Sequence, residues 1–338
     1  MAGSAEKRIT DIIGEKSLRG GMLSLRIDKT VPGGKNIIKR VCNENCIFDY
    51  VTGARCNDDL IKNSTGYALT NAEILGVIKK ISDASKKKIR IHIAGDGEPT
   101  LLNGELVSLV ELLKESGTVN DIKITSNGTM LTYGKPPLIE RLRDAGLNRI
   151  NVSLHSLNGN TFKEITGIDA LPIVLNGIDF AIKANVKTSI NCVVGPKTLS
   201  ELQSFISLSK HKKITIKFFS LLSSDPTIQT SYDALIDEIK QSLLDYSDFH
   251  KNYSVPYNGT LFSIGGAVID LKDSRANTCP NISCNYRAVC TEGCRYEARL
   301  SRAGVLQPCG VRLDNAVDLT KNPDEKKITH ALTSGGKL

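Results

Sequence analysis

The sequence predicts an α/β fold, a partial (β/α)6 barrel of the TIM type with a small cysteine-rich module at its C-terminal end. Strand-like and helix-like segments alternate six times between residues 22 and 222, and five cysteines later fall within 31 residues. Alternation of this kind indicates a parallel sheet, because each helix carries the chain back to the start of the next strand. We expect the barrel over residues 1–222, a connecting helix and strand segment over 223–278, and the module with its tail over 279–338.

Each element follows from a local pattern. The expected strands are short apolar or alternating runs, at residues 22–27, 88–94, 121–125, 149–155, 187–194 and 214–222. The helix after the first strand begins at the capping box Thr70-Asn71-Ala72-Glu73. Further helical patterns cover residues 104–115, 137–145, 170–184 and 200–210, and a last one covers 232–246 before a glycine-bearing segment.

The two faces of these strands differ in polarity. Alternate positions of a strand point to opposite faces, and the positions on one face are here called one parity. One parity is uniformly apolar, which suits a face covered by helices. It holds Ile122, Ile124, Val152, Leu154, Ile190, Cys192, Val194, Ile214, Ile216 and Phe218. The other parity is polar and holds Arg90, His92, Lys123, Thr125, Asn127, Asn151, Ser153, His155, Ser189, Asn191, Thr215 and Lys217. Because TIM barrels normally fill their interior with branched apolar side chains, we infer a hydrated interior that binds something polar. An open sheet with one solvated face is the alternative.

Composition limits the compartment and the partners. The chain is 40% hydrophobic without an apolar run of membrane length, and residues 1–16 lack the apolar segment of a signal peptide, so we expect a cytoplasmic protein without a membrane partner. In a reducing cytosol the nine cysteines are better explained as ligands than as disulfides. The net charge of +8 is modest and its Lys and Arg are scattered, so nucleic acid is not expected, whereas an anionic small molecule fits.

A cysteine pair and a glycine-acid turn indicate where the chemistry lies. Cys42 and Cys46 are separated by three residues on the segment after the first strand, and Gly95-Asp96-Gly97-Glu98-Pro99 closes the second strand. Thiolates at such spacing can wrap an iron–sulfur cluster, and loops after parallel strands gather at one end of a barrel. Half a zinc site or unpaired thiols is the alternative reading of the pair.

The order of these motifs resembles the radical S-adenosylmethionine (radical SAM) superfamily, and in particular its molybdenum-cofactor GTP cyclase branch. The resemblance covers residues 22–222 and 279–315. Its landmarks are the cysteine pair, GDGEPTL at 95–101, ITSNGTML at 124–131, LRDAGLNRINVSLHSLN at 142–158 and NCVVG at 191–195. It implies an enzyme in which three thiolates hold a [4Fe–4S] cluster and its open iron chelates SAM. An electron from a reductant such as flavodoxin or ferredoxin then yields a 5′-deoxyadenosyl radical that removes a substrate hydrogen.

The resemblance also implies positions for SAM contacts. The backbone around Gly97 would meet the SAM amino group, Ser126 and Ser153 the ribose region, and Phe219 the adenosyl side. The full set of cofactor-binding residues implied in this way is Phe48, Gly95, Gly97, Glu98, Ser126, Asn127, Ser153, Asn191 and Phe219. A tight turn without a ligand is the alternative reading for the glycines.

The third cluster ligand departs from the family pattern. Where the third cysteine is expected, three positions after Cys46, this chain has Asp49, and Phe48 before it matches the aromatic residue usual at that position. The next thiol is Cys56. Because a carboxylate is a harder ligand that suits iron–sulfur iron less well, we favour Cys56 on an enlarged loop over Asp49. Loss of the cluster, in a non-catalytic relative, stays open.

The C-terminal cysteines resemble the auxiliary-cluster modules of the same superfamily, called twitch or SPASM. The pattern is Cys284-x5-Cys290-x3-Cys294-x9-Gly304-x4-Cys309, with Cys279 as a spare ligand and a hairpin between Cys294 and Cys309. It implies a second [4Fe–4S] cluster in a C-terminal iron–sulfur module, and a four-thiolate zinc site is the alternative. Cys192 lies on the apolar parity and is expected to pack rather than bind metal.

The substrate is expected to be a polar or anionic small molecule other than GTP. Where the cyclase branch places basic side chains for the triphosphate, this chain has His92 and Ser189, and the entry to the hairpin is altered to residues 294–299. A nucleoside, nucleotide or sugar, in natural-product biosynthesis for example, fits an interior in which His155 and Lys217 act on the substrate. The alternatives are GTP cyclisation, peptide modification, and an iron–sulfur or zinc binding protein without turnover.

Overall fold

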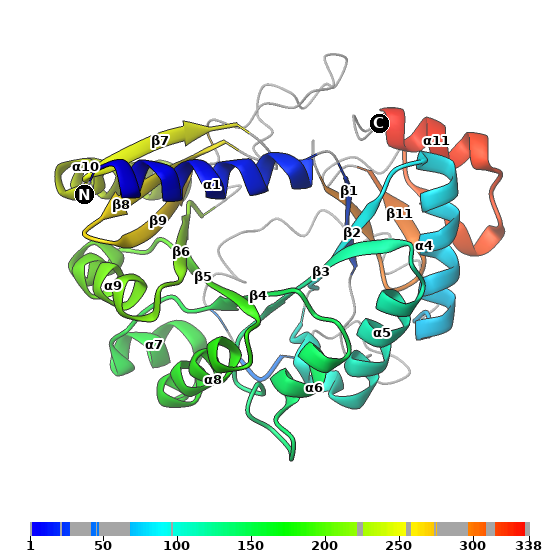
Figure 1. The fold of residues 1–338 in the computed structure, drawn as a ribbon, viewed down its shortest axis with the longest axis horizontal. Helices are drawn as coiled ribbons and strands as arrows, with labels where there is room; N and C mark the ends of the chain where they lie inside the picture. The colour runs from blue at the N-terminus through cyan, green and yellow to red at the C-terminus, as the bar shows by residue number, and fades with distance from the viewer. Residues whose placement is uncertain are drawn as a thin grey trace.

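The computed structural model describes residues 2–20, 22–27, 42–44, 46, 68–95, 97–221, 226–254, 258–273, 275, 297–308 and 315–334. Every strand in these ranges belongs to one curved sheet of 12 strands (Figure 1). Its order is β12-β11-β10-β1-β2-β3-β4-β5-β6-β9-β8-β7. The sheet begins and ends at different strands, so the barrel is partial and does not close.

The six predicted β/α units are confirmed. The strands are β1 (Leu23–Ile27), β2 (Ile89–Ile93), β3 (Val119–Ser126), β4 (Arg149–Ser153), β5 (Lys187–Val193) and β6 (Thr215–Phe219). Their helices are α4 (Asn71–Ser85), α5 (Gly104–Glu115), α6 (Leu138–Asp144), α8 (Leu171–Lys183), α9 (Thr198–Lys212) and, after β6, α10 (Pro226–Tyr246). Thr70 and Glu73 form the predicted capping box at the start of α4. The expected fourth strand is too long, because it ends at Ser153 and leaves His155 in the loop.

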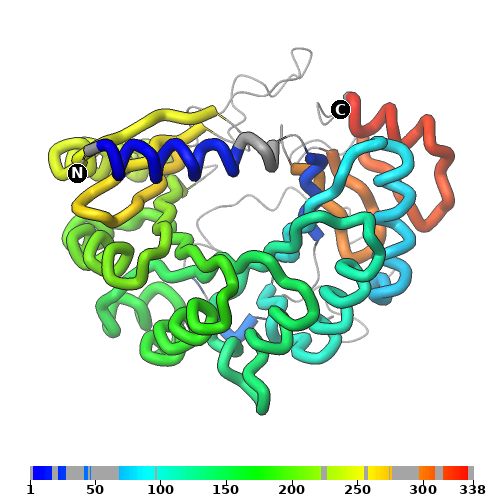
Figure 2. The backbone as a smooth tube through the Cα atoms, in the orientation of Figure 1, coloured from blue at the N-terminus to red at the C-terminus, as the bar shows by residue number. Residues whose placement is uncertain are grey.

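Three α-helices of the described residues were not expected from the sequence, and one of them is α11 (Glu325–Ser334) near the end of the chain. Helix α7 (Gly159–Thr166) begins at Asn158, whose side chain accepts a hydrogen bond from the Thr161 amide and so caps the first turn. Helix α1 (Ala2–Gly20) lies along the open side of the curved sheet (Figure 2). Its Ile9 packs with Tyr253, Leu261 and Val268 in a small apolar cluster apart from the main core.

The segments on either side of residue 276 extend the barrel sheet at both ends. After α10 (Pro226–Tyr246) come β7 (Phe249–Tyr253), β8 (Gly259–Ile264) and β9 (Ala267–Lys272), and β9 pairs in parallel with β6. At the other end β10 (Glu297–Leu300) pairs in parallel with β1, followed by β11 (Val305–Gln307), β12 (Val317–Asp318) and α11 (Glu325–Ser334). Eight strands, from β10 through β9 in the order of the sheet, therefore run parallel to one another.

The predicted hairpin between Cys294 and Cys309 is confirmed in its described part. Strands β10 and β11 are antiparallel, and the turn closes with Ser301 N donating to Val305 O at 2.9 Å. Gly304 has a φ of +85°, and an added Cβ would lie 2.8 Å from Thr320. A side chain at this position would therefore be strained both by its backbone angle and by its neighbour.

The predicted apolar parity forms the main core. Its side chains, among them Ile124, Val152, Ile190 and Phe218, are fully buried beneath the helices outside the sheet. Phe205 of α9 contacts Phe218 edge to face, with ring centroids 5.5 Å apart. Among the described helices none is by itself long and apolar enough to cross a membrane, although α7 and α8, which meet at a bend of 95°, pass by length and composition when taken together.

Candidate cofactor and substrate site

Glu98 ties the loop after β2 to the loop after β3. Its carboxylate accepts hydrogen bonds from Thr100 N at 3.0 Å, Ser126 Oγ at 2.8 Å and Asn127 N at 2.7 Å. The side chain is buried, and burial raises its pKa in spite of these donors. Glu98 and Ser126, two of the residues expected to meet SAM, therefore bind each other. Their geometry supports a framework role beneath the cofactor loops.

The same loop after β3 holds the cysteine pair. Asn127 Nδ2 donates to Asn43 Oδ1 at 2.7 Å and lies 3.8 Å from Cys42 Sγ, which also accepts from Glu44 N at 3.4 Å. Asn127 thus connects the segment of Cys42 to the end of β3 across 85 residues. The thiols are consequently placed beside the Gly97 loop, at the C-terminal ends of β2 and β3.

Glu44 is a feature of this site that the sequence analysis missed. It stands between the two cysteines, accepts from Cys46 Sγ at 3.5 Å through Oε2, and has a buried Oε1 without a partner. Burial raises the pKa of Glu44 to about 7; the bond from Cys46 opposes this rise and the charge of Glu98 adds to it. The sequence signal that could have identified Glu44 was its acidic side chain at the centre of the Cys42-x3-Cys46 spacing.

These residues fit a cluster bound by thiolates. Cys42 Sγ lies next to two N–H donors, and hydrogen bonds to sulfur are a usual means of tuning iron–sulfur clusters. The buried, unpartnered oxygen of Glu44 indicates that the described residues do not complete the site. Phe48, Asp49 and Cys56, which include both candidates for the third ligand, lie outside the described residues, as do Cys279, Cys284, Cys290, Cys294 and Cys309.

The remaining positions expected to meet SAM surround the same end of the sheet. Gly95 and Gly97 lie partly exposed in the loop after β2. Ser153 and Asn191 are aligned neighbours on β4 and β5, and Asn191 Oδ1 is buried without a partner, so it can accept a bond from a bound molecule. Phe219 ends β6 and lies under Lys272, whose Nζ is 5.3 Å from the ring centroid.

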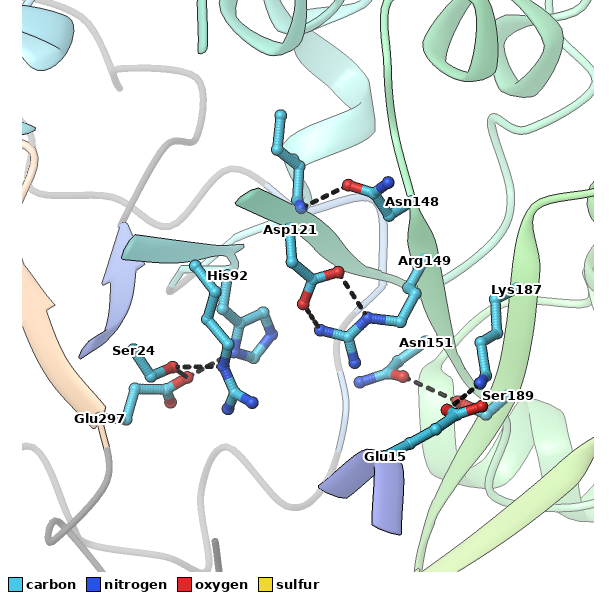
Figure 3. A network of polar contacts seen from close by, with 12 residues as sticks. Glu15, Ser24, His92, Asp121, Asn148, Arg149, Asn151, Lys187, Ser189 and Glu297 are labelled. Atoms are coloured by element: carbon cyan, nitrogen blue, oxygen red, sulfur yellow. Dashed lines mark hydrogen bonds and ion pairs between the residues drawn. The ribbon is translucent and has the colours of Figure 1, made fainter. Parts of the chain in front are cut away.

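The polar parity of the strands forms a connected surface, here called the polar face (Figure 3). It comprises Ser24, Arg26, Arg90, His92, Asp121, Lys123, Thr125, Arg149, Asn151, Ser153, Ser189, Asn191, Thr215, Lys217, Phe219, Asp270, Lys272, Glu297 and Arg299. Strands β9 and β10 thus contribute residues that the sequence analysis assigned to no strand of the barrel. The expectation of a polar interior surface is confirmed, and the surface is larger than expected.

Asn151 is the centre of the hydrogen bonds on this face. Its Oδ1 accepts from Lys217 Nζ and from Ser189 Oγ, each at 2.8 Å, and its Nδ2 lies 3.5 Å from Thr125 Oγ1. Thr125 Oγ1 in turn lies 2.8 Å from His92 Nε2. Burial, together with Lys272 and Lys123, lowers the pKa of Lys217 well below its usual range. The Lys217 side chain is therefore held in a fixed position on β6.

His155 is neutral and has a defined tautomer. Val193 N donates to His155 Nδ1 at 3.1 Å, so the ring proton is on Nε2. Burial lowers the pKa of His155 to about 4. Cys192, next to this pair, is fully buried, and burial raises the pKa of its thiol. This environment confirms the expectation that Cys192 packs in the core.

Comparison with known proteins places this geometry in a family. The pattern described as "Radical SAM superfamily" matches residues 36–209 of this chain. The chain belongs to the radical SAM superfamily. Membership confirms the predicted resemblance and enzyme class, and it implies a [4Fe–4S] cluster and SAM.

Two sequence relatives carry the same name. A probable GTP 3′,8-cyclase of Sulfurisphaera tokodaii is 27% identical over 299 residues, which cover 87% of this chain and 86% of the relative. A probable GTP 3′,8-cyclase of Saccharolobus islandicus is 28% identical over 293 residues, or 83% of each chain. These names favour the GTP cyclase alternative over the expectation of a different substrate.

Solved structures of radical SAM enzymes share the fold. Streptococcus suis SuiB bound to S-adenosylmethionine has a TM-score of 0.57 at 12% identity, covering 95% of this chain and 68% of that one. Native anSMEcpe with bound AdoMet has a TM-score of 0.56 at 15% identity, covering 92% and 82%. In another SuiB structure the chain spans only 60% of the protein it matches. Identities this low show the fold alone.

Proposed function

We propose that this radical SAM enzyme acts on a purine nucleotide bound at the polar face, with GTP as the first candidate. The observation that carries the proposal is the set of basic side chains on the polar face, Arg90 on β2, Lys123 on β3, Lys217 on β6 and Lys272 on β9. Burial lowers the pKa of all three lysines, and bound phosphates would favour their protonated forms. Such side chains suit the phosphates of a nucleotide. The names of the two relatives support the same choice of substrate.

In this proposal, each group of residues has its own role. Cys42 and Cys46, with Cys56 as the preferred third thiolate, hold the cluster, and the Gly97 loop meets SAM. When bound, these cofactors supply a 5′-deoxyadenosyl radical, generated with an electron from a donor such as flavodoxin or ferredoxin. Glu98 and Asn127 hold the two cofactor loops together. Lys217 and His155 orient the substrate below them.

A second cluster forms part of the proposal. Cys290, Cys294 and Cys309, with Cys284 or Cys279 as a fourth ligand, would bind it in a twitch- or SPASM-type module. The described hairpin supports this, because β10 and β11 pair Arg299 with Gln307 inside the Cys294–Cys309 interval.

A substrate without a triphosphate is the second candidate, and the pairing of His92 with Glu297 favours it. Their Nδ1 and Oε1 atoms lie 3.1 Å apart, so a carboxylate and a neutral imidazole occupy part of the polar face. A carboxylate repels phosphate oxygens at short range. A nucleoside, or a sugar with free hydroxyls, would meet this part of the face without such a conflict.

Anaerobic reconstitution followed by a turnover assay tests these proposals. We expect about four irons per bound cluster, and 5′-deoxyadenosine formed in proportion to the GTP consumed. If only guanosine or another uncharged nucleoside is converted, the second candidate replaces the first. If SAM is never cleaved while both clusters are present, the chain is an iron–sulfur protein without turnover.

A further inference from the structure

Asn43, Thr129 and Asn127 form a closed ring of side-chain hydrogen bonds beside the first cysteine of the pair. Asn127 Nδ2 donates to Asn43 Oδ1 at 2.7 Å, and Asn43 Nδ2 donates to Thr129 Oγ1, also at 2.7 Å. Thr129 Oγ1 completes the ring by donating to Asn127 Oδ1 at 2.8 Å. The ring joins the segment of Cys42 to the loop that follows β3.

One backbone donor determines the direction of every bond in this ring. Thr129 N can only donate, and it lies 3.1 Å from the Asn127 side chain, so the atom that it meets is Oδ1. The amide nitrogen of Asn127 therefore faces Asn43, which receives through its own oxygen and donates through its nitrogen to Thr129. The hydroxyl proton of Thr129 is then left for Asn127 Oδ1. The ring closes in this direction alone.

The ring leaves one N–H of Asn127 for Cys42. A side-chain amide nitrogen carries two donors, and the bond to Asn43 uses one of them. The same nitrogen lies 3.8 Å from Cys42 Sγ, which also accepts from Glu44 N at 3.4 Å. Glu44 N belongs to the cysteine segment itself. Asn127 instead brings its donor from the end of β3, 85 residues away.

Asn127 is held in place by contacts that do not involve a cluster. The residue is 5% exposed, and its backbone N donates to Glu98 Oε2 at 2.7 Å. It directly follows β3, which lies between β2 and β4 in the sheet. A buried amide that turned away from these partners would leave a donor unpaired at a cost of about 1–3 kcal/mol. The N–H is therefore preorganised towards Cys42 Sγ.

We propose that Asn127, oriented by Asn43 and Thr129, raises the reduction potential of the SAM cluster through its hydrogen bond to Cys42 Sγ. This inference rests on the proposed function, in which Cys42 is a ligand of that cluster. Reduction adds one negative charge, which the ligand sulfurs share, so a donor at Cys42 Sγ stabilises the reduced cluster more than the oxidised one. Electron transfer from a carrier such as flavodoxin or ferredoxin then becomes more favourable. Asn43 and Thr129 are positioning residues, because they act through Asn127.

The midpoint potential of the SAM cluster in the reconstituted enzyme tests this inference. A redox titration follows the electron paramagnetic resonance signal that changes when SAM is added, and this change distinguishes the SAM cluster from the auxiliary one. Asn127→Leu removes the donor and keeps a side chain of similar size. We expect an about tenfold smaller ratio of reduced to oxidised cluster at a fixed potential. For a one-electron couple this corresponds to a midpoint lower by about 59 mV.

Two substitutions of Thr129 test whether the ring orients the donor. Thr129→Val keeps the shape but removes the hydroxyl, so Asn43 loses an acceptor and Asn127 loses a donor. We expect its potential to shift in the same direction as in Asn127→Leu. Thr129→Ser keeps the hydroxyl and should keep the wild-type potential. Glu164→Gln, at an exposed ion pair with Lys197, is the distant control and should also keep it.

Iron content and potential together decide the result. An unchanged potential in Asn127→Leu, with about four irons in its SAM cluster, overturns the role of Asn127 and leaves the proposed function intact. A wild type that binds no SAM cluster overturns both. If Asn127→Leu does not retain the cluster, Thr129→Val and Thr129→Ser decide. A lower potential in Thr129→Val alone supports the inference, and equal potentials in the two variants overturn it.

Discussion

Lys16 Nζ of α1 lies 2.9 Å from Asp270 Oδ2 on β9, inside the molecule, and so joins the first helix to a strand 254 residues later. Asp270 is fully buried, and Tyr253 donates to its other oxygen. Burial alone would raise its pKa, but Lys16 and Lys272 outweigh that effect and lower the pKa to about 2. The contact therefore anchors α1 across the open side of the sheet.

Replacing Lys16 by Met is expected to destabilise the fold by about 3 kcal/mol at pH 7, because the buried Asp270 carboxylate loses its counterion. In the wild type the folded pKa of Asp270, about 2, lies below the roughly 3.9 of an unfolded aspartate, so its stabilisation is present above pH 4 and lost as the pH falls through 2. In Lys16→Met, the stabilisation that depends on ionised Asp270 should begin to disappear at a higher pH than in the wild type. Urea unfolding at several pH values measures both effects.

Lys187→Met provides the control for this prediction. Lys187 pairs with Glu15, the neighbour of Lys16 on α1, but both side chains are about half exposed. Surface ion pairs contribute roughly 0–1 kcal/mol. A loss of similar size in both variants would show that the Lys16–Asp270 pair has no special role in holding α1.

The third ligand of the SAM cluster is expected to be Cys56. Cys56→Ala should remove about four irons per chain, because two thiolates leave a cluster exposed to loss, whereas Asp49→Ala should not. Iron and sulfide analysis after anaerobic reconstitution measures both. The reverse result would assign the ligand to Asp49, and retention in both variants would require a ligand from outside the chain.

The auxiliary cluster is expected to depend on Cys294. Cys294→Ala should lower the iron content by about one cluster and loosen the C-terminal region, because metal binding in a small module is coupled to its folding. Limited proteolysis and hydrogen exchange of residues 297–308 report the second effect. Stoichiometric zinc in protein purified without oxygen would contradict the assignment.

Lys217 is expected to serve the substrate more than SAM. Lys217→Ala should lower substrate conversion by about a hundredfold while uncoupled SAM cleavage changes less, since misplacement of a substrate by about 1 Å can have this effect. Lys212→Ala, at a partly exposed pair with Asp179 on the outer side of the barrel, should leave both rates unchanged. The ratio of 5′-deoxyadenosine to product gives the measurement.

His155→Ala is expected to show the same imbalance. Equal loss of conversion and uncoupled cleavage would instead move either residue into the SAM site, and full turnover would remove it from the substrate site. His155 is the nearer of the two to Ser153, an expected ribose contact, so its variant distinguishes the two sites more directly.

Nucleotide affinity is expected to weaken as the pH rises through 8. Burial and the charge of Lys16 lower the pKa of Lys272 to about 8, while Asp270 opposes the shift. Lys272 is therefore cationic below this pH and neutral above it, and an anionic ligand should bind more weakly at pH 9 than at pH 7. Dissociation constants for GTP should lose this dependence in Lys272→Gln. The same slope in the variant would assign the titration to another group.

The sequence alone determined the repeating units and the family. Alternation of apolar and polar residues is a local property, and it predicted six strands, the buried parity with Ile124 and Val152, and the polar parity with His92 and Lys217. The capping box at Thr70 and the hairpin before Cys309 were likewise readable, because caps and turns depend on a few adjacent residues. The order of the motifs predicted the family.

Only the tertiary structure decided which distant residues complete the polar face. Strand β9 pairs with β6 across 53 residues, as Thr215 with Val268, and β10 pairs with β1 across 273 residues, as Ser24 with Glu297. Local patterns do not specify such partners. The sequence signal for the role of β9 in the polar face was Asp270, a lone acidic residue in an otherwise apolar strand. The sequence signal for helix α1 was the spacing of the apolar residues Ile9, Ile12 and Ile13. The contact of Glu297 with His92 depends on β1 lying between their strands. Their roles therefore follow from the assembled sheet, because the sheet alone brings a carboxylate, an imidazole and an amine into one chain of hydrogen bonds.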